Sequence, residues 1–185
     1  QSKYKNQLLI NKVDINRFNR QLIKNNTDVI NPLLMPNTLS KNSLVELING
    51  ISSVPTSARF YDDGSKLVEK DFDAYRDSLN MSGVLSQNNV RWGLVVKRTS
   101  LRTFPTKDRV FNGAMDKDLD RFQETGVFPG ESVAVLHESK DKQWYLVHSY
   151  NYLAWVLQKD IAIGEKEAVN NYVNPRGFLV VTGDK

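Results

Sequence analysis

Hydrophobic and polar positions along the chain divide it into a helical first part and a β-rich second part. In the first part, three segments place apolar residues three or four positions apart, which is the spacing of one helix face. These segments cover residues 14–23, 40–48 and 69–79. From about residue 90 the pattern changes to short runs of β-branched and aromatic residues separated by turn residues. The pattern therefore predicts helices followed by a sheet.

The second predicted helix carries recognisable end signals. Ser43 with Glu46 matches a capping box, and Ser40 is the alternative N-cap. Gly50 is predicted to end this helix, because glycine readily adopts the left-handed conformation that follows a last turn. Residues 61–65 predict a turn between the second and third helices.

The helical part holds few large apolar side chains. Its first 35 residues are rich in Asn, Lys and Gln, and the first 80 residues contain too little apolar surface for a core of their own. We therefore expect this part to pack against a neighbouring domain, as an adaptor rather than a freestanding enzyme.

The β-rich part contains four runs typical of strands. They are residues 94–96, 132–137, 144–149 and 153–156. The turn at residues 139–142 predicts a hairpin between the second and third runs. A turn centred between Lys140 and Asp141 would place Val135 opposite Leu146.

A long loop precedes most of these runs and a short turn follows them. The long loop covers residues 102–128, and residues 159–162 predict a 3₁₀ turn. Short strands, an early long loop and a late 3₁₀ turn are typical of an SH3-like barrel of about five strands. The predicted fold class is mainly β, a small SH3-like β-barrel preceded by a helical and loop-rich segment.

Composition and charge narrow the functions that the chain can have. The 185 residues are 40% hydrophobic and 25% charged, as in a soluble folded chain of one or two domains. The net charge of +4 is spread along the chain, so we expect no nucleic acid as partner. No apolar run approaches the roughly 20 residues of a membrane span. The chain has no cysteine, which excludes disulfides and a cysteine nucleophile.

No other pattern of catalytic or metal-binding residues stands out. The two histidines, His137 and His148, lie on predicted strands, and in the predicted hairpin His137 faces Trp144 while His148 faces about Val133. They should therefore not form a metal pair. We expect no catalytic residue, no metal and no cofactor in this chain.

The long loop offers a candidate binding site of charged residues. Leu119 and Phe122 have helical spacing and are expected to bury against the barrel. That arrangement would hold Asp120, Arg121 and Gln123 outward as a polar site. The alternative is an ion-paired turn, in which Asp120 and Arg121 fix the loop. The sequence leaves both interpretations open.

Aromatic residues form a second candidate binding site. Tyr150, Tyr152, Trp155 and Trp92 could present ring faces to a sugar or a peptide. Trp155 and Trp144 lie in predicted strands, which favours a place in the core. Tyr150 lies in a turn and is the better binding candidate.

Several of these segments together resemble a known family. They are residues 98–106, 119–124, 128–131, 133–139 and 149–155. Their sequences resemble the bacterial SH3-like domain of multidomain NlpC-type cell-wall peptidases, over most of residues 90–162. The first third of the chain is similar, more loosely, to the stabilising "clip" segment that precedes that barrel, and Asn80 with Met81 fits its motif.

The resemblance implies a function for the chain's relatives. In that family a C-terminal domain carries a cysteine nucleophile, activated by a histidine, that cleaves the γ-D-glutamyl bond to a diamino acid in peptidoglycan stem peptides. The barrel's long loop narrows the cleft and helps to select peptides with a free N-terminal L-alanine. The matching loop residues are Asp120, Arg121, Phe122, Gln123 and Glu124. Tyr150 and Tyr152 complete the expected binding residues.

The expected organisation follows from this resemblance. Residues 1–88 would form the clip, 89–164 the SH3-like barrel, and 165–185 a linker or short helix and the first strand, at 175–184, of a truncated second SH3-like domain. We expect a non-catalytic N-terminal half of a peptidoglycan hydrolase, which stabilises a missing C-terminal peptidase domain and shapes its cleft for the stem peptide. The protein would be exported to the cell envelope or beyond, with its signal peptide removed. The alternative is an independent wall-binding or adhesion module, whose aromatic residues contact glycan or peptide directly.

Overall fold

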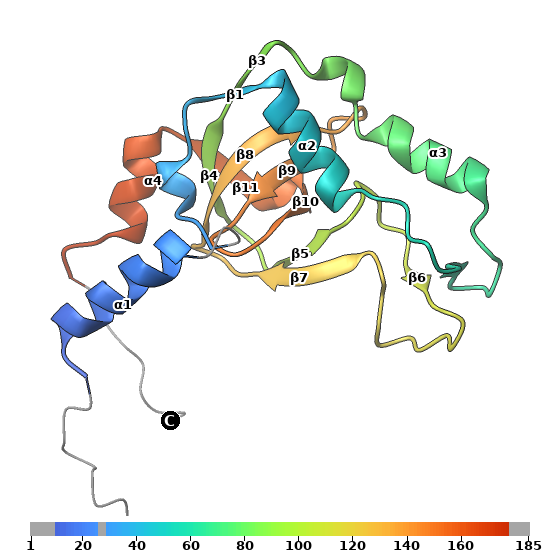
Figure 1. Cartoon of the computed structure of the whole chain (residues 1–185), viewed down its shortest axis with the longest axis horizontal. Helices are drawn as coiled ribbons and strands as arrows, with labels where there is room; N and C mark the ends of the chain where they lie inside the picture. The colour runs from blue at the N-terminus through green and yellow to red at the C-terminus, as the bar shows by residue number, and fades with distance from the viewer. Residues whose placement is uncertain (1–9, 26–28, 178–185) are drawn as a thin grey trace, which may run out of the picture.

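A curled antiparallel sheet lies at the centre of the molecule, with helices around it (Figure 1). The structure is a computed structural model and describes residues 10–25 and 29–177. Its main strands are β4 (Arg91–Val95), β5 (Thr99–Arg102), β7 (Gln123–Val127), β8 (Ser132–Glu138), β9 (Trp144–His148), β10 (Leu153–Leu157) and β11 (Ile161–Gly164). Among the described residues these seven strands pair in the order β11-β4-β8-β9-β10-β5-β7.

Strands of the sheet bury side chains on both faces. Successive residues of a strand point to opposite faces. In β8, Val133 and Val135 lie in the core inside the curled sheet, whereas Ala134 and Leu136 lie in a second core shared with the N-terminal helices. This double burial explains why the strand sequences are apolar runs rather than alternations. Each fully buried Val or Leu contributes about 1.5–3 kcal/mol.

The predicted fold class is confirmed, with differences in detail. The expected barrel of about five strands is a seven-stranded sheet in the described part of the chain, and its end strands β7 and β11 do not pair with each other. The long loop supplies the extra strand β7 at its end, so it is less irregular than expected. The 3₁₀ turn is present as η3 (Gln158–Asp160), but residues 161–162 already belong to β11.

Within the described residues, three helices precede the sheet, as predicted. They are α1 (Lys12–Asn25), α2 (Lys41–Ile51) and α3 (Glu69–Ser78). Helix α1 buries none of its residues and projects away from the sheet (Figure 1). Helix α2 buries Leu44 and Ile48, and α3 buries Phe72 and Tyr75, in the second core. The segment from α2 to α3 therefore packs against the sheet of its own chain.

The ends of α2 decide between the predicted alternatives. Ser40 is its N-cap, because its Oγ accepts a hydrogen bond from the backbone N–H of Ser43 at 3.2 Å. The predicted end at Gly50 is wrong, since the helix continues to a C-cap at Ser52. Ile51 packs against both cores and holds the last turn in place.

Short elements tie the N-terminal segment to the rest of the chain. Strand β1 (Thr38–Ser40) pairs with β3 (Gln87–Asn89), and β2 (Phe60–Tyr61) pairs with β6 (Val110–Phe111) of the long loop. The predicted turn follows β2, with Gly64 at φ +86°. The remaining elements are the 3₁₀ turns η1 (Pro32–Leu34) and η2 (Met81–Gly83) and the helix α4 (Lys166–Val173).

The β8–β9 hairpin has a different register from the predicted one. Val135 pairs with Val147, and His137 pairs with Leu146, with a bulge between these pairs. The connecting turn is longer than predicted, because the side chain of Asp141 accepts hydrogen bonds from Ser139 Oγ and from the backbone N–H of residue 143. His148 pairs with Ala134 rather than with Val133.

After β11 the chain forms α4, which packs next to β4. Val169 of α4 is buried in the second core, so residues 165–167 begin a helix, one of the two expected alternatives. Of the predicted last strand, residues 175–177 are not in a strand and residues 178–184 lie outside the described part of the chain.

Candidate functional site

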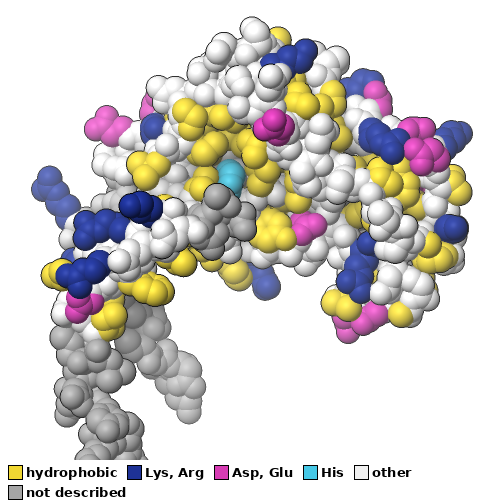
Figure 2. All heavy atoms as spheres, in the orientation of Figure 1, with side chains coloured by type: hydrophobic (Ala, Val, Ile, Leu, Met, Phe, Trp, Pro, Cys, Tyr) yellow, Lys and Arg dark blue, Asp and Glu magenta, His cyan; other side chains and the backbone are white. Residues whose placement is uncertain are grey.

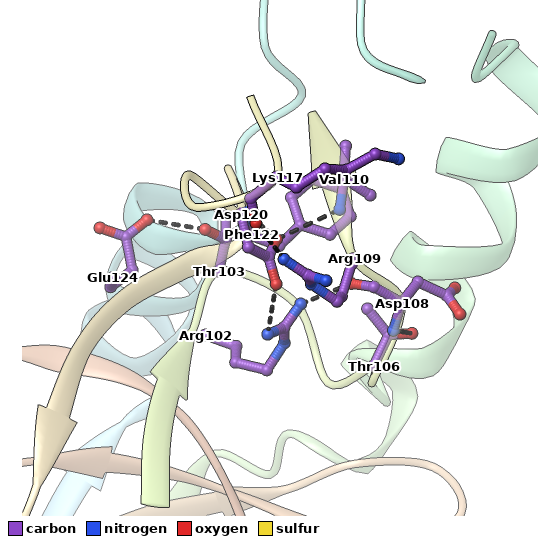
Figure 3. A network of polar contacts seen from close by, with 10 residues as sticks. All are labelled: Arg102, Thr103, Thr106, Asp108, Arg109, Val110, Lys117, Asp120, Phe122 and Glu124. Carbon is purple, nitrogen blue, oxygen red and sulfur yellow. Dashed lines mark hydrogen bonds and ion pairs between the residues drawn. The ribbon is translucent and has the colours of Figure 1, made fainter. Parts of the chain in front are cut away.

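A buried ion pair holds the long loop in place. Arg102 lies at the end of β5, and its Nη1 is 2.9 Å from Oδ2 of Asp120. The two side chains are only 7% and 8% exposed. The other carboxylate oxygen of Asp120 accepts hydrogen bonds from the backbone N–H groups of Val110 and Phe122 at 3.2 and 3.0 Å (Figure 3). Arg102 also donates to the Asp108 carbonyl. Asp120 therefore fixes an ion-paired turn, with Arg102 rather than Arg121 as its partner.

Phe122 is buried as predicted, but Leu119 is not. Phe122 is 2% exposed, and its ring lies 5.1 Å from that of Phe104 and 5.3 Å from that of Tyr75, between centroids. Leu119 is 48% exposed. Residues 119–120 are irregular and residues 121–122 form a turn, so no helix places both side chains on one face.

Side chains of the N-terminal segment also form hydrogen bonds with the long loop. The Tyr75 hydroxyl, from α3, donates to Asp108 Oδ2 at 2.7 Å and lies 3.2 Å from the Tyr61 hydroxyl. Burial, followed by these two hydrogen bonds, raises the pKa of Tyr75 well above its usual value. Lys117 donates to Asp62 at 2.9 Å. Together with the β2–β6 pairing, these contacts make the loop and the N-terminal segment one structural unit.

Two predicted site residues meet at the base of the loop. Glu124, on β7, accepts a hydrogen bond from the Tyr152 hydroxyl at 2.5 Å on one carboxylate oxygen and from Thr103 Oγ1 at 2.7 Å on the other. The bond to Glu124, followed by burial, raises the pKa of Tyr152 to about 12. Glu124 and Tyr152 are both half-buried. The carboxylate is thus held in one orientation and still reaches solvent.

A pocket of about 350 Å³ opens beside Glu124, between the N-terminal segment and the loop. Its lining residues are Gly50, Ile51, Ser53, Pro55, Arg59, Thr103, Arg121, Phe122 and Glu124. Arg121 and Glu124 were predicted as site residues, and the pocket brings them together. Arg59 and Thr103 were not predicted. Arg59 lies far from the loop in sequence, and no local pattern marks it.

The tryptophans are structural. Trp155 is fully buried, as its strand position predicted, and Trp92 and Trp144 are also buried. The indole N–H of Trp155 donates to Ser52 Oγ at 2.9 Å, and that hydroxyl donates to the Thr103 carbonyl at 2.7 Å. This chain of hydrogen bonds fixes the end of α2 against β5, at the edge of the pocket.

Two further predicted site residues, Tyr150 and Gln123, do not take part in the hydrogen bonds of Glu124 and Tyr152. Tyr150 is 56% exposed in the turn before β10, and its carbonyl accepts from the backbone N–H of Ile30 at 2.8 Å. Gln123 is exposed at the start of β7. Among the described residues, neither side chain forms a hydrogen bond with Glu124, whose partners are Thr103 and Tyr152.

His137 has a structural environment. Its Nε2 lies 3.2 and 3.1 Å from the carbonyl oxygens of Leu79 and Asn80. Carbonyls only accept, so Nε2 carries the proton. Burial lowers the pKa of His137 and keeps the ring neutral. In the ranges 10–25 and 29–177, no three His, Asp or Glu side chains cluster in a way that could hold a metal ion.

On the side of the molecule seen in Figure 2, lysine and arginine side chains gather over α1. Lysine and arginine side chains are interspersed with aspartate and glutamate on the lobe that contains α3 and β6 (Figure 2). None of the helices in the described residues has the length and apolar character needed to cross a membrane.

Comparisons with known proteins agree with this fold. Residues 109–157 match the family model of the SH3 domain (SH3b1 type). The structure is similar to that of an NlpC/P60 endopeptidase from Photobacterium damselae subsp. piscicida, with a TM-score of 0.68 and 18% sequence identity. The similarity covers 92% of this chain and 41% of that chain. No curated protein matches the chain. The resemblance to the SH3-like part of NlpC-type peptidases is thus confirmed, at the level of a shared fold.

Proposed function

We propose that this chain, which has an SH3b1-type domain within a fold shared with an NlpC/P60 endopeptidase, is the non-catalytic N-terminal part of a peptidoglycan stem-peptide hydrolase. Its role is to stabilise a C-terminal peptidase domain and to shape the substrate cleft of that domain. The chain has no cysteine, so a cysteine nucleophile would come from the peptidase domain. The whole enzyme would act in the cell envelope or outside the cell.

The observation that carries the proposal is the Glu124 carboxylate at the base of the long loop. Two hydroxyl groups, from Thr103 and Tyr152, orient it, and each oxygen keeps a lone pair for a ligand. An oriented, partly desolvated carboxylate suits an ammonium group, because a charge-assisted hydrogen bond is stronger than a neutral one. The free N-terminal amine of a stem peptide has this chemistry.

The buried ion pair supports this role. Arg102 and Asp120 hold the turn from which β7 begins, and β7 carries Glu124. In this proposal Asp120 and Phe122, which the family resemblance identified, position the loop, because Asp120 pairs with Arg102 and Phe122 is buried. Arg121 and Glu124 are the charged members of that motif that line the pocket, next to the ring of Phe122.

The test is binding of a stem peptide to the full chain, followed by NMR of the labelled protein. We expect saturable binding of a peptide with a free N-terminal L-alanine and at least tenfold weaker binding of its N-acetylated form, since about 1.4 kcal/mol corresponds to tenfold. Glu124→Gln should remove this preference. Glu46→Gln, at an exposed position on α2, is the matched control. Equal binding of both peptides by the unmodified chain would contradict the proposal, as would cleavage of the peptide by this chain alone.

An independent wall-binding module is the second candidate, and the exposed ring of Tyr150 favours it. In that case the chain alone should bind purified sacculi tightly. Tyr150→Ala should then weaken this binding, and Glu124→Gln should leave it unchanged. The opposite result, weak binding to sacculi that depends on Glu124, favours the hydrolase.

A further inference from the structure

The pocket between the N-terminal segment and the long loop contains two arginines that form no ion pair with any residue that the structure describes. We propose that Arg59 and Arg121 form a subsite for a carboxylate group. This subsite deepens the proposed function, on which the identity of the natural ligand rests. Carboxylate binding itself depends only on the pocket.

Both arginines line the same pocket but come from different parts of the chain. Arg59 precedes β2 in the N-terminal segment, and Arg121 lies in the turn just before β7. The backbone N–H of Arg121 donates to the Val110 carbonyl at 2.6 Å, which fixes the start of its side chain. The subsite therefore exists only because the N-terminal segment folds against the loop.

Each guanidinium keeps hydrogen-bond donors for a ligand. Arg59 uses Nη1 to donate to Ser57 and to the Ala58 carbonyl, so its other nitrogens stay available. The Arg121 side chain makes no hydrogen bond or ion pair within the described part of the chain. By contrast, the buried Arg102 is paired with Asp120.

The two positive charges repel each other across the pocket. Burial lowers the pKa of Arg59, and the charge of Arg121 lowers it further. An anion placed between the two groups would relieve this repulsion, because opposite charges within about 4–6 Å favour the charged form. A carboxylate also matches the planar fork of a guanidinium, which can bind both of its oxygens at once.

The negative charge of Glu124 at the same pocket narrows the class of ligand. Glu124 would repel a multiply charged anion and attract an amine. A ligand with one carboxylate and one nearby ammonium satisfies both ends of the pocket. A stem peptide has this pattern, because a glutamyl residue linked through its γ-carboxyl group leaves its α-carboxylate free beside an alanine with a free amine.

A pair of peptides that differ only at the carboxylate provides the test. Both contain L-alanine joined to D-glutamate, with the γ-carboxyl group capped as a methylamide. One keeps the α-carboxylate and the other carries an α-carboxamide. We expect the full chain to bind the carboxylate peptide about tenfold more tightly, by NMR titration, because hydrogen bonds to charged groups contribute about 1.5–3 kcal/mol.

Arginine variants assign this preference to the subsite. Arg59→Gln and Arg121→Gln should each reduce the binding of the carboxylate peptide to the level of the carboxamide peptide. Arg98→Gln removes an arginine that does not line the pocket and should change nothing. Arg121→Lys keeps the charge without the planar fork and should retain part of the preference. The amide spectra of all variants would show whether the fold is kept.

The outcomes separate this inference from the proposed function. Equal binding of the two peptides, or a preference that persists in both arginine variants, would overturn the subsite. Acetylation of the alanine amine tests Glu124 alone. If acetylation changes nothing while the carboxylate preference persists, the amine-binding role fails and the arginine subsite stands. Absence of binding of every peptide at millimolar concentration would overturn both.

Discussion

Arg102 and Arg121 both lie within the long loop, but they differ in burial and in the charged groups around them. Arg102 is buried and has Asp120 and a backbone carbonyl as partners. Arg121 is exposed and lines a pocket with a second, like-charged arginine. One charge is neutralised inside the fold, and the other is left at the surface beside a cavity. The difference separates the part of the loop that fixes its shape from the part that can meet a ligand.

This comparison changes the meaning of the family motif at residues 120–124. The resemblance suggested binding by all of its residues. In the structure, Asp120 and Phe122 are buried, with the Phe122 ring at the pocket wall, whereas Arg121 and Glu124 are the charged members of the motif that line the pocket. Asp120 therefore fixes the loop, and Arg121 and Glu124 bring opposite charges to the pocket.

Removal of the buried Arg102 side chain should cause the largest loss in the free energy of unfolding. Arg102→Ala leaves the Asp120 carboxylate in the interior without its counter-charge, which typically costs about 3–5 kcal/mol. Urea unfolding would measure this loss. Asp120→Asn keeps an acceptor for the backbone but loses the charge, so it should destabilise less than Arg102→Ala. A loss below about 1 kcal/mol for Arg102→Ala would contradict the buried pair as the fixing element.

Loss of the Ser52 hydroxyl, which links the end of α2 to Trp155 and Thr103, should cause the second largest loss of stability. Ser52→Ala leaves the buried Trp155 N–H and the Thr103 carbonyl without their partner, at an expected cost of about 1–3 kcal/mol. Ser53→Ala, at the next and exposed position, should change the free energy of unfolding by less than about 0.5 kcal/mol. Equal effects of the two substitutions would show that the hydrogen-bond chain contributes nothing.

Tyr152→Phe should have a smaller effect that depends on pH. Its hydroxyl donates to Glu124, and the pKa of Tyr152 is raised to about 12. Because the folded-state pKa exceeds the unfolded value of about 10, the contribution is complete below pH 10 and is lost as the pH rises through 12. The loss at neutral pH should be about 0.5–1.5 kcal/mol.

Ultraviolet titration would identify this tyrosine. The group that ionises near pH 12 should disappear from the titration of Tyr152→Phe. Tyr150→Phe, which alters the exposed ring of the same turn, should leave it in place. A titration with no tyrosine above about pH 11 would contradict the hydrogen bond to Glu124.

Arg121→Gln should have the smallest effect on stability. Its guanidinium makes no hydrogen bond or ion pair with the described residues, so the free energy of unfolding should change by less than about 0.5 kcal/mol. Urea unfolding of Arg121→Gln and Arg102→Ala under the same conditions would compare the contributions of the two arginines to stability. A large loss of stability would mean that the Arg121 side chain has a structural role, and it would contradict the availability of this guanidinium for a carboxylate.

The sequence predicted elements whose signals are local. Ser40 marks the start of α2, and the apolar runs mark β8, β9 and β10. Errors arose where a side chain overrides the backbone pattern. Asp141 lengthens the hairpin turn and shifts its register, and Ile51 carries α2 past Gly50.

The candidate site was only partly predictable. Glu124 and Tyr152 were named because they lie in segments that resemble a family, but nothing in the sequence joined them by a hydrogen bond. Arg59 has no signal of its own, since its partner Arg121 comes from the other side of the fold. Contacts of this kind depend on the packing of the N-terminal segment against the loop, which a pattern of apolar positions does not specify.

The pairing of β2 with β6 has a consequence for protein engineering. Residues 110–111 of the loop pair with residues 60–61, so the conformation of the loop depends on two distant stretches of the polypeptide. A loop transplanted alone into a related domain would arrive without the strand that it lies against. Recombination between relatives should therefore preserve specificity only when both stretches are inherited together.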